Sequence, residues 1–154
     1  MTSAPTRYAL ADLAGLLGTR LGVSGWLTVD QSRVDLFADA TGDDQWIHVD
    51  PERAASGPYG ATIAHGYLTL SLLPVLVGEA FRLTGVGRRV NYGLDKVRFP
   101  SPVVVGARVR AVVTLREVEP VPAGGIRMGL RCVVEIEDGG KPACVADTLT
   151  LLMA

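Results

Sequence analysis

The chain is short of cysteine and of long apolar runs, and each shortage excludes a class of protein. Its two cysteines, Cys132 and Cys144, follow no metal-ligand spacing and are too few for a disulfide framework. The most apolar stretch, residues 67–77, is interrupted by polar residues and proline and is far shorter than the ~20 residues that span a membrane. Residues 1–7 lack the basic-then-apolar order of a signal peptide. We therefore expect a cytoplasmic protein with reduced thiols and no membrane partner.

The chain also lacks a charge excess of either sign. It has 15 basic and 16 acidic residues without a basic run or stripe, so we expect no nucleic-acid partner. With 154 residues and no repeat or linker, residues 1–154 are predicted to form a single domain. The mean hydropathy of +0.28 is apolar for a small soluble domain, and this favours a homodimer in which a second subunit covers apolar surface.

Helical signals dominate the first half of the chain. Asp30 is a predicted N-cap for a short helix that ends at Gly42, and Asp50-Pro51 predicts the start of another helix. Residues 43–49 are then a short loop between two helical pieces. Before them, the pattern predicts a helix and a strand over residues 10–17 and 23–29.

The segment from Gly66 to about Arg82 is apolar on nearly every side, which predicts a helix buried in the middle of the fold. Pro74 should remove one backbone hydrogen bond and bend it. After Gly85 the apolar period becomes two, which predicts antiparallel strands with one wet face. These strands are expected over residues 90–99, 107–115, 126–136 and 143–153. The expected fold class is α+β, with the antiparallel sheet wrapped around the apolar helix.

Only two histidines exist, His48 and His65, so any histidine-based mechanism must use one of them. His48 follows Asp43 by five residues on the predicted loop. A carboxylate and an imidazole on one short loop can share a water, and one group can take a proton while the other supplies one. The alternative is that Asp43 caps the turn after Gly42 and His48 is a solvated loop residue.

The start of the apolar helix is the second candidate feature. If the helix begins at Gly66, its first N–H groups lack helical partners and can stabilise negative charge on a carbonyl oxygen. Glycine would let a ligand approach the backbone closely. The alternative is an ordinary tight turn into a helix. His65 is expected to hydrogen-bond locally and set this loop.

Taken together, residues 41–50 (TGDDQWIHVD), residues 64–69 (AHGYLT) and residues 91–100 (NYGLDKVRFP) resemble the MaoC-like dehydratase family, in particular its (R)-specific enoyl-CoA hydratases. The similarity extends over most of the chain from about Asp30 onward and is specific in order and spacing. It implies the hot-dog fold, a curved antiparallel sheet around a central helix, in dimers or larger assemblies.

The resemblance also implies roles for individual residues. Asp43 and His48 match the catalytic aspartate and histidine, and Gly66 matches the glycine whose N–H binds the thioester oxygen. The implied reaction is reversible hydration of a trans-2-enoyl-CoA to the (R)-3-hydroxyacyl-CoA. An acyl-CoA thioester is then the substrate, with no separate cofactor and no metal. The chain departs from the family motif at Gln45-Trp46, where Asn-Pro is commoner, which puts the acyl-chain preference in doubt.

Four basic residues could hold the phosphates of coenzyme A, because basic side chains pair with phosphate. They are Arg88, Arg89, Lys96 and Arg98. The alternative for them is a solvated strand edge. Two other functions stay open: a hot-dog thioesterase, for which Glu79 is the only acidic residue in the central helix, and a non-catalytic acyl-thioester binding protein.

Overall fold

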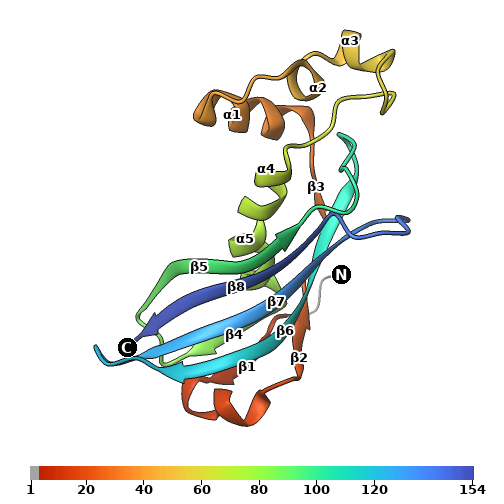
Figure 1. Cartoon of the computed structure of the whole chain (residues 1–154). Helices are drawn as coiled ribbons and strands as arrows, with labels where there is room; N and C mark the ends of the chain where they lie inside the picture. The colour runs from red at the N-terminus through yellow and green to blue at the C-terminus, as the bar shows by residue number, and fades with distance from the viewer. Residues whose placement is uncertain (1–3) are drawn as a thin grey trace.

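The computed structural model describes residues 4–154; the first three residues of the N-terminal segment discussed above lie outside the described residues. The main element of the fold is one curved antiparallel sheet with the strand order β2-β6-β7-β8-β5, and β3 also pairs with β6 (Figure 1). Its strands are β2 (Arg20–Val23), β3 (Leu27–Thr28), β5 (Arg88–Arg98), β6 (Arg108–Pro120), β7 (Ile126–Ile136) and β8 (Cys144–Met153). This confirms the predicted α+β class and the run of strands in the second half.

The period of two along β6 and β7 separates a buried face from a wet one. Along β6, Val109, Ala111 and Val113 are fully buried, whereas the alternating arginines face solvent. On the wet face, basic and acidic side chains pair between neighbouring strands, as Arg131 does with Asp147 at 2.8 Å. The hydrogen bond from Arg131 lowers the pKa of the Asp147 carboxyl below its usual value.

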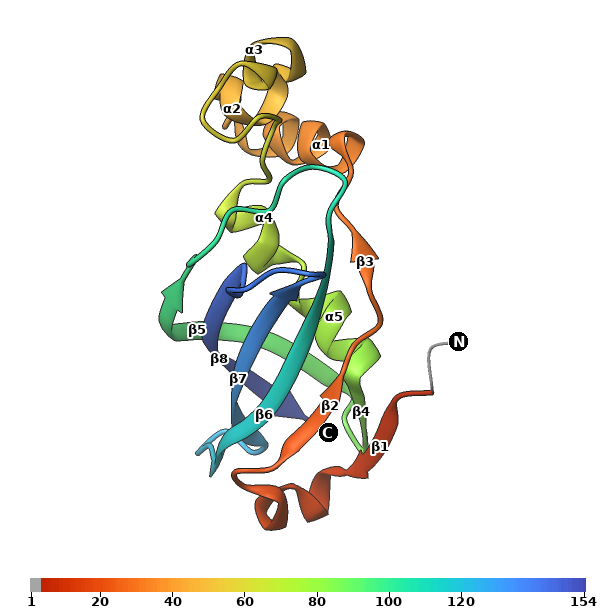
Figure 2. The ribbon, with the colours of Figure 1, turned by 90° about the vertical axis from the view of Figure 1, so that its right-hand side faces the viewer.

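The central helix is in two pieces, α4 (Gly66–Ser71) and α5 (Leu73–Ala80), which run along the concave side of the sheet (Figure 2). The break at Leu72 lies two residues before Pro74, so the predicted disturbance by proline is confirmed. The predicted end at Arg82 is wrong. The helix stops at Ala80. The next residues form β4 (Phe81–Thr84), whose backbone groups make their hydrogen bonds with the parallel strand β1 (Thr6–Ala9) instead of within a longer helix.

One side of the helix faces the core and another faces solvent. Leu68, Leu73 and Leu76 are buried against the sheet. Tyr67 keeps 69% of its surface exposed and Val75 keeps 46%. The expectation that the helix is buried on every side is therefore wrong for a single chain, because the sheet curls around only part of it.

The N-terminal half also contains the helices η1 (Leu10–Leu16), α1 (Gln31–Thr41), α2 (Trp46–Val49) and α3 (Pro51–Ala55). Asp30 and Asp50 cap α1 and α3 as predicted, each accepting a hydrogen bond from the backbone N–H three residues later. Helices α1 to α3 lie beyond the start of α4, away from the sheet (Figure 1). No helix within residues 4–154 has the length and apolarity to cross a membrane.

Candidate active site

Helix α1 ends at Gly42, and the chain then turns toward the site. Its φ of +78° is left-handed, and its N–H closes the helix on the Ala38 carbonyl. Asp43 then lies exposed at the turn, and His48 follows on α2. The prediction that residues 43–49 are a loop is wrong for residues 46–49, which form one helical turn. That turn points His48 inward, where only 8% of its surface is exposed, so it is not a solvated loop residue.

The backbone and the ring of His48 are both held by hydrogen bonds. Its Nδ1 lies 2.7 Å from the Ile63 carbonyl oxygen, which can only accept, so Nδ1 carries the proton and Nε2 has the free lone pair. Gln31 Nε2 donates to the His48 carbonyl at 2.8 Å, and Thr62 donates to Gln31 Oε1 at 2.5 Å. These contacts fix both the tautomer and the position of the imidazole.

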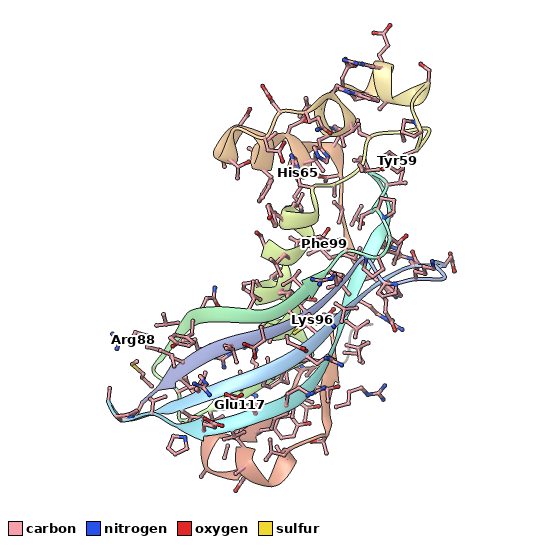
Figure 3. The ribbon with its side chains drawn as sticks, in the orientation of Figure 1. Tyr59, His65, Arg88, Lys96, Phe99 and Glu117 are labelled. Carbon is pink, nitrogen blue, oxygen red and sulfur yellow. The ribbon has the colours of Figure 1, made fainter. Side chains whose placement is uncertain are left out.

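His65 joins this arrangement from the residue before α4. Its Nε2 donates to the Asp43 carbonyl oxygen at 2.8 Å, so the expectation of a local hydrogen bond is wrong: the contact reaches back 22 residues. Its ring stacks on His48 with centroids 3.9 Å apart and planes inclined by 25°. On the other side it meets Phe37, with a centroid distance of 4.9 Å. Figure 3 shows His65 between the helices above it and the start of α4.

A carboxylate oxygen of Asp43 and one ring nitrogen of each histidine lie within 4.8 Å of one another. Two groups that each hydrogen-bond the same water at about 2.8 Å are about 4.6 Å apart. A separation within 4.8 Å therefore allows one water to contact both the carboxylate and an imidazole.

Gly66 begins α4, as predicted, and is in close contact with an aromatic ring. A Cβ at this position would lie 2.9 Å from Cδ2 of Phe99, closer than such contacts allow. The absence of a side chain thus lets Phe99, just after β5, pack on the helix start. Figure 3 shows Phe99 beside α4.

A model of the MaoC-like domain family matches residues 12–127. The chain belongs to the MaoC-like dehydratase family. It is 53% identical over 149 residues to a 3-hydroxyacyl-thioester dehydratase Z of Mycobacterium tuberculosis, covering 97% of this chain and 99% of that one. A nodulation protein N of Rhizobium leguminosarum is 46% identical over 94% of this chain and 91% of its own length.

Solved structures show the same fold in the MaoC-like family. An unliganded R-hydratase from Pseudomonas aeruginosa matches with a TM-score of 0.68 at 23% identity, covering 92% of this chain and 84% of that one. The resemblance drawn from residues 41–50, 64–69 and 91–100 is therefore confirmed for family and hot-dog fold. The expectation of an enzyme of the hydratase and dehydratase class is confirmed as well.

The four basic residues predicted for coenzyme A do not gather at one place in this MaoC-like chain. Arg88 and Arg89 begin β5, whereas Lys96 and Arg98 end it, and seven to ten residues of strand amount to about 23–33 Å. Arg88 Nη2 contacts the sulfur of Met153 at 2.8 Å. Only Lys96 and Arg98 lie at the end of β5 that leads to Phe99 and Gly66, and Figure 3 shows Lys96 and Arg88 well apart.

An open groove of about 650 Å³ runs between the central helix and the concave face of β5, β8 and β7. It begins at Leu70 and Ser71, about one turn after Gly66, and continues past Pro74 and Val77. Sheet residues complete it, among them Met128, Leu130 and Leu149. Apolar side chains thus form much of its lining close to the helix start.

Several residues that build the site escaped the sequence reasoning. Gln31, Thr62 and Phe37 hold the two histidines, yet they lie on α1 and in the loop before α4, where no local pattern marks them. Phe99 stood inside the motif of residues 91–100 without a role. Only the fold brings these side chains to the histidines and to Gly66.

Proposed function

We propose that this protein catalyses the reversible hydration of trans-2-enoyl-CoA to (R)-3-hydroxyacyl-CoA, with Asp43 and His48 as its acid–base pair. The observation that carries the proposal is the spacing of at most 4.8 Å between the Asp43 carboxylate and a His48 nitrogen, beside the start of α4. The dehydratase named among its relatives supports the same class of reaction.

Asp43 and His48 would hold one water for attack on C3 of the enoyl group. The oxygen of that water bonds to C3, one proton of the water passes to the acid–base pair, and C2 receives a proton from it. No atom is left over, and no cofactor beyond the coenzyme A of the substrate is needed. Such acid–base assistance accelerates reactions by typically about 10²–10⁴-fold.

The Gly66 N–H would stabilise the thioester oxygen as negative charge develops on it. An N–H at a helix start has no partner within the helix and lies at the positive end of the dipole. The acyl chain would follow the groove along the central helix, past Leu70 of α4 and Val77 of α5. Lys96 and Arg98, near this end of β5, would contact the phosphates of coenzyme A.

We further propose that the protein acts as a homodimer joined along β5. This strand is at the edge of the sheet and pairs only with β8 within residues 4–154. Tyr92 is 60% exposed on it, and Val90 and Leu94 are also exposed. An apolar strand edge of this kind favours pairing with a second chain, and a second copy would also cover Tyr67 and Phe99.

An assay of crotonyl-CoA hydration tests the function. The loss of the ultraviolet absorbance of the enoyl thioester measures the rate. Wild type should be active, and Asp43→Asn and His48→Gln should each lose about 10²–10⁴-fold in kcat while unfolding at the same temperature as wild type. Full activity in both variants would remove the mechanism. Release of free coenzyme A thiol instead would indicate a thioesterase, although Glu79 is about 20 Å along the helix from Gly66.

A further inference from the structure

His65 connects the three components of the proposed site through three different contacts. Its Nε2–H donates to the backbone carbonyl of Asp43, its ring stacks on His48, and it is bonded directly to Gly66. Only 2% of its surface is exposed, so it is not placed to meet a ligand in this conformation. Its influence on chemistry must therefore pass through these neighbours.

The hydrogen bonds require opposite tautomers in the two stacked rings. His48 faces a carbonyl with Nδ1, and His65 faces a carbonyl with Nε2. A carbonyl oxygen only accepts, so His48 carries its proton on Nδ1 and His65 carries its proton on Nε2. The remaining lone pairs are then on His48 Nε2 and His65 Nδ1.

The second nitrogen of His65 has no partner of its own. Among the buried side-chain nitrogen and oxygen atoms of residues 4–154, only His65 Nδ1 has no hydrogen-bond partner. Phe37 contacts the ring and offers no acceptor. His65 therefore makes its side-chain hydrogen bond through Nε2 alone, to the Asp43 carbonyl.

We propose that His65 is a positioning residue of the hydration reaction, an inference that rests on the proposed function. Through its Nε2–H it ties the Asp43 backbone to the start of α4, and its ring supports the imidazole of His48. Acid, base and the Gly66 N–H are thereby held at the spacing that one water and one thioester require. Misplacement of such groups by about 1 Å can cost about 10²-fold in rate.

Two substitutions separate the hydrogen bond from the ring. His65→Gln keeps an N–H donor at the distance of Nε2 and loses the ring, whereas His65→Phe keeps a ring and loses the donor. We expect His65→Phe to lower kcat for crotonyl-CoA by about 10²-fold with KM changed less than about threefold, since substrate contacts remain. His65→Gln should recover kcat to within about tenfold of wild type.

Val113→Ala is the matched control, because Val113 is fully buried in β6, where its partners on the neighbouring strands are Gly22 and Cys132. It should lower the unfolding temperature and leave kcat unchanged when assayed well below that temperature. If kcat in both His65 variants stays within about threefold of wild type, the positioning role is wrong while the hydratase function stands. If wild type itself is inactive, the proposed function fails instead.

A second measurement is independent of turnover and reads the wild-type rings directly. The chain has only two histidines, so an untagged, ¹⁵N-labelled wild-type protein should show just two imidazole spin systems. We expect an Nδ1–H tautomer for one and an Nε2–H tautomer for the other near neutral pH, assigned with His48→Gln. The same tautomer in both rings would overturn the proposal.

Discussion

The site at the start of α4 and the edge strand β5 differ in which side chains they expose to solvent. At the site, the two histidines are buried and Gln31, Thr62 and the Ile63 carbonyl hold His48. Along β5, apolar residues such as Tyr92 and Leu94 are exposed. The imidazoles are enclosed where chemistry is proposed while Asp43 is exposed, and apolar groups on β5 are exposed next to the groove. The proposed acid–base pair would thus be assembled within one chain, whereas the proposed homodimer would complete the wall of the groove.

The largest effect should come from removing both members of the acid–base pair. Because Asp43 and His48 would act on the same water, the double variant Asp43→Asn/His48→Gln should be about as slow as the slower single variant, at about 10²–10⁴-fold below wild type. Turnover of crotonyl-CoA in the three variants measures this. Losses that multiply would show that the two residues act independently.

A smaller effect is expected from breaking the β5 edge. Tyr92→Asp with Leu94→Asp places like charges opposite one another in the proposed dimer, so the mass in solution should fall to the 16.3 kDa of one chain. We expect kcat/KM to fall about tenfold, because Tyr92 and Leu94 themselves line the groove and the proposed second copy would no longer cover it.

Leu36→Asp is the control for the β5 edge, since Leu36 is 66% exposed but lies on α1. Its mass, measured by light scattering, should remain that of the wild-type assembly. Unchanged mass and activity in the β5 variant would remove the proposed homodimer and leave the acid–base pair in place.

Filling the groove should change chain-length preference and spare the chemistry. Val77→Phe narrows the groove about three turns after Gly66. The kcat/KM for long-chain enoyl-CoA substrates should fall by about 10–200-fold, whereas crotonyl-CoA should change less than about twofold. Equal losses for short and long substrates would place the acyl chain outside this groove.

The smallest effect is expected from the buried thiols, which lie in the sheet away from the site. Burial raises the pKa of Cys132 from 9.0 to about 12 and that of Cys144 to about 11. Below pH 9 both the folded and the unfolded chain keep these protons, so ionisation of the thiols does not change the free energy of unfolding there. Above it the unfolded chain loses protons that the folded chain retains, and stability should fall as the pH rises toward 12.

Denaturant unfolding of wild type and Cys132→Val across the alkaline range measures this decline. The variant should lose stability less steeply, because one of the two thiols is gone. If stability falls with pH equally steeply in both proteins, folding does not raise the pKa of Cys132.

The strand pattern and the helix caps were readable from the sequence because they depend on near neighbours. Alternating residues set β7 to the predicted residues 126–136, and Asp30 and Gly42 set the ends of α1. The order and spacing of Asp43, His48 and Gly66 carried the family resemblance, which the comparisons confirm. These features are determined locally by side-chain period, capping chemistry and motif spacing.

Only the tertiary structure decided how His65 meets Asp43 and His48, and which nitrogen of each ring carries the proton. Those contacts join residues 15 to 22 positions apart, so the path of the chain through α2 and into α4 had to be known first. The split of the basic residues between the two ends of β5, and the exposure of Tyr67 and Tyr92, likewise follow from sheet order and curvature. Burial and distance are properties of the whole packed fold, and no short stretch of sequence specifies them.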